Sequence, residues 1–175
     1  MKYELELKVT PYTIKNFKIV RIPKEQSDKF TSRGQVMVEG LINNQHFVTP
    51  LEPDGKFGHW FNLNDIDPKA NYSHSPIDLK INQISLWDEP NVPNDIKKAL
   101  NSDQNVLKLW KTITPMARWE WIRWINSTAS ADTRSKRIRV ALDKMNKGER
   151  RPCCWNRNLC SEPAVSRNGV LLAKN

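Results

Sequence analysis

The hydrophobic pattern of the chain changes its period once, at Pro93, and this change limits the folds that the sequence can adopt. Before Pro93, apolar and polar residues alternate, as in the N-terminal stretch YELELKV, which is typical of strands with one buried face. After Pro93, apolar residues recur every three to four positions, which is typical of amphipathic helices. We therefore predict an α+β protein, with an N-terminal antiparallel β-barrel over residues 1–90 and a C-terminal small helical bundle over residues 91–175.

About five to seven short strands are predicted in the barrel. The dipeptide Asn43-Asn44 lies between two apolar runs, and asparagine tolerates the positive φ angles of a tight hairpin turn. A later stretch, DGKFGHW, supplies another bend and contains His59. We interpret this stretch as a hairpin turn with a half-exposed histidine, and the alternative is the mouth of a binding site.

The helical part shows clear start and stop signals. Thr114 precedes Pro115, and this pair suits an N-cap followed by the first helical position. Gly148 suits the left-handed residue that ends a helix. In the C-terminal tail, residues 170–172 are the part that we expect to dock or pair. We expect successive helices to begin at Pro93 or Asn94, Ser102, Thr114, and Ser130 or Asp132.

The helix after Thr114 contains three tryptophans within six residues. Trp119 points away from the core face of this helix, together with Arg123 one turn later. Two interpretations remain open. Trp119 packs on another part of this chain, or it stacks with Arg123 and presents a flat cationic surface to a base or a carboxylate. The predicted core face consists of Ala117, Trp121, Trp124 and Ile125.

Arg134 lies on the apolar side of the next helix, so its charge must either reach solvent or meet an acceptor. One interpretation is a structural pair with a carboxylate, for which Glu120 is a candidate. The other is an anion ligand that faces a cleft. We expect a concave, positive surface between the helical module and the barrel. Its predicted border, which is our candidate anion- or ligand-binding site, consists of Trp119, Arg123, Arg134, Arg137 and Trp155.

The positive charge is concentrated in the C-terminal part of the chain. Of the formal net charge of +9, residues 1–112 carry +1 and residues 113–175 carry +8. Such an excess attracts an anionic partner, which could be a nucleic acid, an acidic protein or an anionic membrane surface. The alternative is a solvated basic face of the helices.

The sequence contains no P-loop, nucleophile elbow, zinc-protease motif or dinucleotide-binding motif. We therefore expect no enzymatic activity and no cofactor. Cys153, Cys154 and Cys160 lack the spacing of a zinc site, and we expect them to bind no metal and to form no disulfide with one another. Since no apolar run is long enough for export or membrane insertion, we expect a cytoplasmic protein without a transmembrane segment.

Several segments of the sequence resemble a known bacterial family in their order and spacing. PNDIKKALNSD, LWKTITPMARWEWIRWI, TRSKRI and the ending Lys147-Gly148 are similar to the YdeI/OmpD-associated family, also labelled bacteriocin-protection proteins. This resemblance covers about Val92 to Gly148. The preceding VEGLINNQHFVTPLEPDGKFGHWFNL resembles a small β-barrel domain of unknown function that commonly stands before such a helical segment.

The resemblance implies a non-enzymatic cytosolic binding protein of unknown ligand, with a role in stress tolerance or in protection against antimicrobial peptides or bacteriocins. The alternative is a nucleic-acid-binding protein that uses the basic helical module and its exposed aromatic side chains. Both hypotheses are compatible with an anionic partner, either an acidic protein or a nucleic acid.

Overall fold

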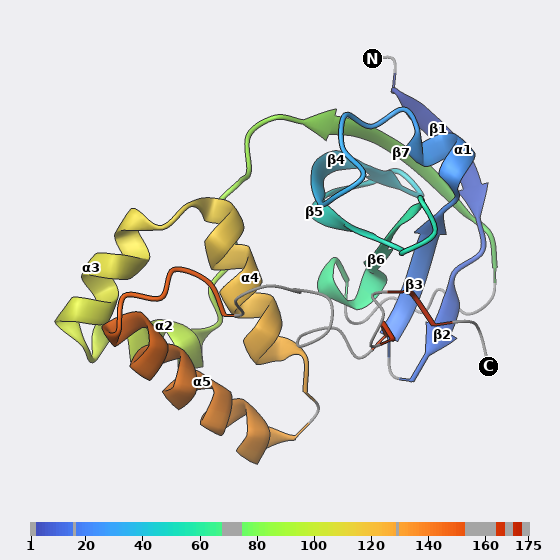
Figure 1. Cartoon of the computed structure of the whole chain (residues 1–175). Helices are drawn as coiled ribbons and strands as arrows, with labels where there is room; N and C mark the ends of the chain where they lie inside the picture. Colours follow the sequence, from blue (N-terminus) through green and yellow to red (C-terminus); the bar gives the residue numbers. More distant parts are fainter. Residues whose placement is uncertain are drawn as a thin grey trace. The chain divides into compact units, whose positions relative to one another are not determined.

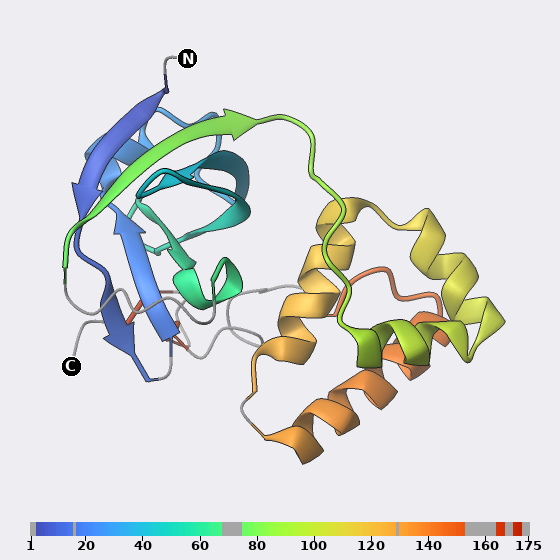
Figure 2. The ribbon, with the colours of Figure 1, turned by 180° about the vertical axis from the view of Figure 1, so that it is seen from behind.

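The computed structural model describes residues 3–15, 17–67, 75–128, 130–152, 164–166 and 170–172. The chain divides into two compact units, each shown as a ribbon in Figures 1 and 2. The strand unit consists of Met1–Leu86 together with Ala164–Asn175, and the helical unit consists of Trp87–Pro163. The strand unit thus includes the end of the tail. The expected division into domains at residue 90 stays a prediction.

The strand unit contains one antiparallel sheet of seven strands in the order β1-β7-β4-β5-β6-β3-β2. A short helix, α1 (Lys24–Ser27), follows β3, and a 3-10 turn, η1 (Leu63–Asp65), follows β6. The predicted α+β class with antiparallel strands before helices is confirmed. The strands are β1 (Leu5–Val9), β2 (Tyr12–Ile14), β3 (Phe17–Ile22), β4 (Val36–Ile42), β5 (Gln45–Pro53), β6 (His59–Asn62) and β7 (Ile77–Ile84).

The connection between β1 and β2 explains why the sheet curls. These strands occupy opposite ends of the sheet order, yet only Thr10 and Pro11 lie between them in the chain. The three Cα–Cα steps from Val9 to Tyr12 span at most about 11 Å, so the two ends of the sheet must approach each other. The predicted barrel is therefore a curled sheet of half-barrel form (Figures 1 and 2).

The β4–β5 hairpin shows how local sequence sets the register of the sheet. Asn43 and Asn44 have φ angles of 48° and 70°, and they join a ladder in which Ile42 pairs with Gln45. The predicted two-residue turn is confirmed.

Gly40, in the middle of β4, has no room for a side chain, because a Cβ there would lie 2.0 Å from the carbonyl oxygen of Lys80 on β7.

Alternating apolar residues of the strands form the main core of the strand unit. The rings of Phe47 and Phe61 stack within it, with centroids 5.8 Å apart. Burial of such side chains is the dominant stabilising term of a small unit of this kind. The buried core residues are Leu5, Val20, Ile22, Phe30, Val36, Val38, Ile42, Phe47, Leu51, Phe61, Leu63, Ile77, Leu79 and Ile81.

A second, smaller core joins the C-terminal tail to β2, β3 and β6. Leu171 pairs with Val165 in an isolated β-bridge, and its N–H donates to the carbonyl oxygen of Asp54 over 2.9 Å. The tail docks because its apolar side chains are buried against these strands, as expected for residues 170–172. The buried members of this cluster are Ile14, Ile19, Trp60, Ala164 and Leu171.

The helical unit contains the expected succession of helices. Thr114 and Ser130 cap α4 and α5 as predicted, since their hydroxyls accept from the N–H groups of Ala117 and Thr133. For α3 the expected cap, Ser102, is wrong. Asp103 caps that helix instead, because Ser102 is still the C-terminal cap of the helix before it. The helices are α2 (Asn94–Asn101), α3 (Gln104–Thr112), α4 (Pro115–Asn126) and α5 (Ala131–Asn146).

Helix α4 contributes Ala117, Trp121, Ile122 and Ile125 to the buried core of the helical unit. Trp121 is completely buried, as predicted, and meets the half-buried ring of Trp124 edge to face at 6.1 Å. Glu120 and Ile122 are also buried, so α4 is covered over a wider face than the sequence indicates. In the parts of the chain that the structure describes, no helix is long and apolar enough to cross a membrane.

Candidate functional site

Arg134, at the start of α5, is held by the side chain of Asp95 on α2. Its Nε and Nη2 donate to Oδ2 and Oδ1 of Asp95 over 2.6 and 3.0 Å, and its Nη1 donates to Oδ1 of Asn126 over 2.6 Å. The hydrogen bond from Arg134 lowers the pKa of Asp95 below its ordinary value of 3.8. The structure thus shows a two-pronged pair between carboxylate and guanidinium, and the partner is Asp95 rather than Glu120.

Arg137, one turn further along α5, binds the C-terminal end of α4. Its Nη1 donates to the carbonyl oxygen of Trp124 over 2.6 Å and to the hydroxyl of Ser127. Its guanidinium also lies 5.4 Å from the centroid of the Trp124 ring. A cation at this end of a helix is favoured by the helix dipole. Burial lowers the pKa of Arg137, and it stays charged because an arginine pKa is far above neutrality.

Arg118 on α4 binds the C-terminal end of α3 in the same way. Its Nε and Nη2 donate to the carbonyl oxygens of Trp110 and Lys111 over 2.9 and 3.0 Å. Its Nη1 pairs with the carboxylate of Glu89, and its guanidinium lies 6.0 Å from the centroid of the Trp110 ring. The sequence analysis missed this residue. The signal that could have found it is the repeated order of a tryptophan near a helix end and an arginine in the next helix.

The other predicted site residues have mixed outcomes. Trp119 is half-buried, and its Nε1 donates to the carbonyl oxygen of Asp88 over 2.9 Å. This contact supports the interpretation that Trp119 packs on its own chain. Arg123 is half-buried on the same helix. Trp155 lies outside the described residues, as do Cys153, Cys154 and Cys160, so the predicted surface that would gather all five residues stays a prediction.

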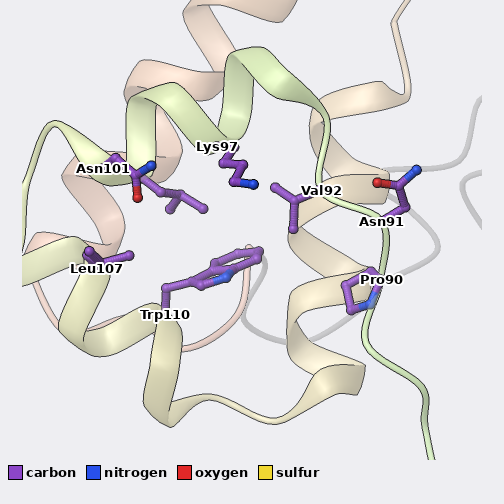
Figure 3. Close-up of a pocket in the computed structure, with 8 residues that line it drawn as sticks. Pro90, Asn91, Val92, Lys97, Asn101, Leu107 and Trp110 are labelled. Atoms are coloured by element: carbon purple, nitrogen blue, oxygen red, sulfur yellow. The ribbon is translucent and has the colours of Figure 1, made fainter.

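The helical unit instead shows a pocket of about 360 Å³ between α2, α3 and the segment before α2 (Figure 3). In the close-up, the side chains of Val92 and Lys97 lie near the indole of Trp110. The volume is at the lower end of the range of small-molecule sites. The lining consists of Pro90, Asn91, Val92, Lys97, Leu100, Asn101, Leu107 and Trp110.

The pocket combines a fixed aromatic wall with one cationic side chain. Trp110 is almost fully buried, and Arg118 binds both its carbonyl oxygen and its ring. Lys97 is exposed, and its ammonium group has no partner among the described residues. None of the described residues that line the pocket is acidic. An acidic group of a ligand would therefore meet an uncompensated charge at Lys97 while its apolar part contacts Trp110 and Leu107.

The strand unit holds its own cluster of polar groups around Asp54, whose side chain is fully buried. Its Oδ2 accepts from Nε of Arg21 over 2.7 Å, and its Oδ1 accepts from the N–H groups of Lys56 and Gly58 over 2.7 and 2.8 Å. Burial raises the pKa of Asp54, but these hydrogen bonds outweigh it and hold the pKa below the ordinary 3.8. Asp54 is thus the anchor of the loop from Asp54 to Gly58.

His59, which follows this loop, is fully buried, so the expected half-exposed histidine is wrong. Its Nε2 donates to the carbonyl oxygen of Gly34 over 2.8 Å, and Phe30 meets its ring edge to face at 5.4 Å. Its Nδ1 has no hydrogen-bond partner in the part of the chain that the structure describes. Burial lowers the pKa of His59 below 6.5.

Within the described ranges, no group of three or more His, Cys, Asp or Glu side chains could hold a metal ion.

Comparison with known families places the pocket in a defined segment. Residues 89–148, which contain every pocket residue and Arg118, match the family described as bacteriocin-protection, YdeI or OmpD-associated. Residues 6–66 match a domain of unknown function, DUF1905. The two matches lie in the order that the resemblance indicated, with the match to the domain of unknown function before the match to the YdeI/OmpD-associated family. Neither a curated protein nor a solved structure gives a significant match.

Proposed function

We propose that the protein is a non-enzymatic binding protein whose helical unit takes a small ligand with an apolar body and an acidic group. The observation that carries this proposal is the pocket at Trp110, because it offers apolar walls and the unpaired ammonium group of Lys97. A carboxylate or phosphate at Lys97 would fix the orientation of the ligand. Contact with Trp110, Leu100 and Leu107 would supply most of its affinity.

The state of the arginines also favours this pocket over a nucleic-acid interface on the helical unit. Arg118, Arg134 and Arg137 donate hydrogen bonds to carboxylate, carbonyl or hydroxyl oxygens of their own unit. A phosphate backbone would have to replace these contacts, and so the excess of arginine in this segment overstates its capacity to bind nucleic acid.

At the family level, we propose a role in protection against bacteriocins or related stress, which is supported by the description of the matched family. In this role the ligand would be an acidic amphiphile rather than a protein surface, since the pocket is small. Survival of bacteriocin-treated cells that produce the wild type or Lys97→Met tests this role. Equal survival of cells with the wild type and with Lys97→Met would show that the charge in the pocket has no part in protection. The expected cytoplasmic location stays a prediction, and cell fractionation tests it.

Binding of octanoate and of phenylbutyrate, followed by isothermal titration calorimetry, tests the pocket itself. Lys97→Met keeps the length of the side chain but removes its charge, so we expect affinity for both acids to fall about tenfold. Lys98→Met is the matched control, because Lys98 is an exposed neighbour on α2 outside the pocket lining. We expect it to bind like the wild type.

Two further measurements separate the apolar and the charged contributions. Octanol, which lacks the acid group, should bind the wild type and Lys97→Met equally. Leu107→Phe should weaken all of these ligands, because the larger ring occupies pocket volume. Absence of any binding, or equal losses in the Lys97 and Lys98 variants, would overturn the proposed site.

A further inference from the structure

The loop from Asp54 to Gly58 carries a large apolar side chain that is mostly exposed. Phe57 is 68% exposed. Together with Leu86, it is one of two large apolar side chains that are mostly exposed within the described ranges. Its φ angle is +69°, a left-handed conformation that is costly for an aromatic residue and is usually taken by glycine or asparagine. Phe57 therefore combines exposure with backbone strain.

The cause of the strain is the anchoring of the loop on Asp54. The N–H groups of Lys56 and Gly58, on either side of Phe57, donate to the same carboxylate oxygen, and the N–H of Asp54 donates to the carbonyl oxygen of Gly58 over 3.0 Å. Gly58 leaves no room for a side chain, since a Cβ there would lie 2.6 Å from Oδ2 of Asp54. The loop is thus a rigid support that fixes Phe57 in its exposed position.

A cation accompanies the exposed ring. The guanidinium of Arg33 lies 5.5 Å from the centroid of the Phe57 ring, and its Nη1 donates to the carbonyl oxygen of Phe57 over 3.2 Å. Asp28 holds the other side of this guanidinium, with Nη2 to Oδ1 at 2.8 Å. Lys56, next to Phe57, is exposed and has no ion pair among the described residues. The loop therefore presents a flat ring, a fixed guanidinium and a free ammonium group.

We infer that this loop is a stacking platform for a nucleobase, with Lys56 meeting the attached phosphate and Arg33 holding the Phe57 ring in place. Base stacking on one aromatic ring needs only a small flat surface and a nearby cation. A protein partner would need a larger apolar patch around the ring, whereas the chain neighbours of Phe57 are Lys56 and Gly58. The ligand could be a free nucleotide or a single strand, since both offer the same base and phosphate. This site belongs to the strand unit, whereas the pocket belongs to the helical unit.

Fluorescence anisotropy with a labelled oligothymidylate, and competition by uridine monophosphate, test the inference on the whole chain. Phe57→Asn removes the ring and suits a positive φ angle, so we expect affinity for the oligonucleotide to fall about tenfold while the melting temperature stays equal or rises. Leu86→Asn is the matched control, because it removes the other exposed apolar side chain. It should bind like the wild type.

Competition by uridine monophosphate at concentrations that displace the oligonucleotide would identify the nucleotide as the recognised unit. Displacement only by a longer strand would identify a single strand. Lys97→Met should leave this binding unchanged, which keeps the test independent of the helical pocket. Equal affinities of the Phe57 and Leu86 variants would overturn the platform. If polyglutamate binds instead of the oligonucleotide and its binding also depends on Phe57, the nucleobase platform is wrong and the loop binds an acidic protein partner.

Discussion

Replacing Arg134 by alanine distinguishes the two interpretations of this residue, a structural ion-pair partner or an anion ligand. The change removes two hydrogen bonds to Asp95 and one to Asn126. If the arginine ties α5 to α2, the helical unit should lose stability. If it serves an external anion, stability should change little and anion affinity should fall.

The exposure of the pair sets the expected size of the effect. The side chains of Arg134 and Asp95 are 26% and 46% exposed, so the loss of about 3–5 kcal/mol that follows removal of one partner of a buried pair does not apply. Exposed pairs contribute at most about 1 kcal/mol, and two-pronged geometry with a third hydrogen bond adds to this. We expect Arg134→Ala to lower the free energy of unfolding by about 1–2 kcal/mol.

Urea unfolding followed by far-ultraviolet circular dichroism measures this loss, with Lys136→Ala on the same helix as the control. Lys136 is exposed, and its loss should change stability by less than about 0.5 kcal/mol. In a double-mutant cycle, Asp95→Asn should couple to Arg134→Ala. A loss above about 3 kcal/mol would show that the pair is desolvated. An unchanged stability with weakened anion binding would refute the structural interpretation.

The pair of Arg134 and Asp95 also predicts how the stability of the helical unit depends on pH. The pKa of Asp95 is lowered by the hydrogen bond from Arg134, so the folded state binds the proton less readily than the unfolded state does. The stabilising effect is present above the ordinary pKa of 3.8 and is lost as the pH falls below it. The difference in stability between the wild type and Arg134→Ala should shrink over that range, and a difference that persists below it would contradict this origin.

Two further substitutions test the strand unit. Gly40→Ala should lower its stability by about 3 kcal/mol or more, because the added Cβ meets the backbone of Lys80 at 2.0 Å; Gly34→Ala, where the nearest atom is 3.4 Å away, is the control. His59→Gln should flatten the pH dependence of stability. The lowered pKa of His59 means that the wild type loses stability as the pH falls below 6.5, and an unchanged pH profile in the variant would assign that loss to other groups.

Local rules predicted the parts of the fold that depend on neighbouring residues. Thr114 caps α4, and the Asn43-Asn44 turn has the positive φ angles that asparagine permits. The error at Ser102 is also local, because two adjacent residues can both cap a helix and only the geometry selects Asp103. Such predictions succeed because the stabilising contact lies within a few residues of the chain.

The features that the sequence could not predict depend on contacts between distant segments. Arg134 finds its partner on α2, 39 positions earlier, and no helical wheel of α4 or α5 contains that information. His59 is buried because Phe30 and the Gly34 carbonyl come from another part of the chain. The pocket has no motif, since two helices and the segment before them form it jointly.

The docking of the tail on the strand unit has a consequence for biosynthesis. The residues that complete the cluster of Ile14, Ile19 and Trp60 are Ala164 and Leu171, and they are translated only after the whole helical unit. Although the sheet leaves the ribosome first, part of its apolar surface stays exposed to solvent until Ala164 and Leu171 have been translated. The order of synthesis and the order of completion are therefore opposite: the helical unit can finish folding before the strand unit that precedes it.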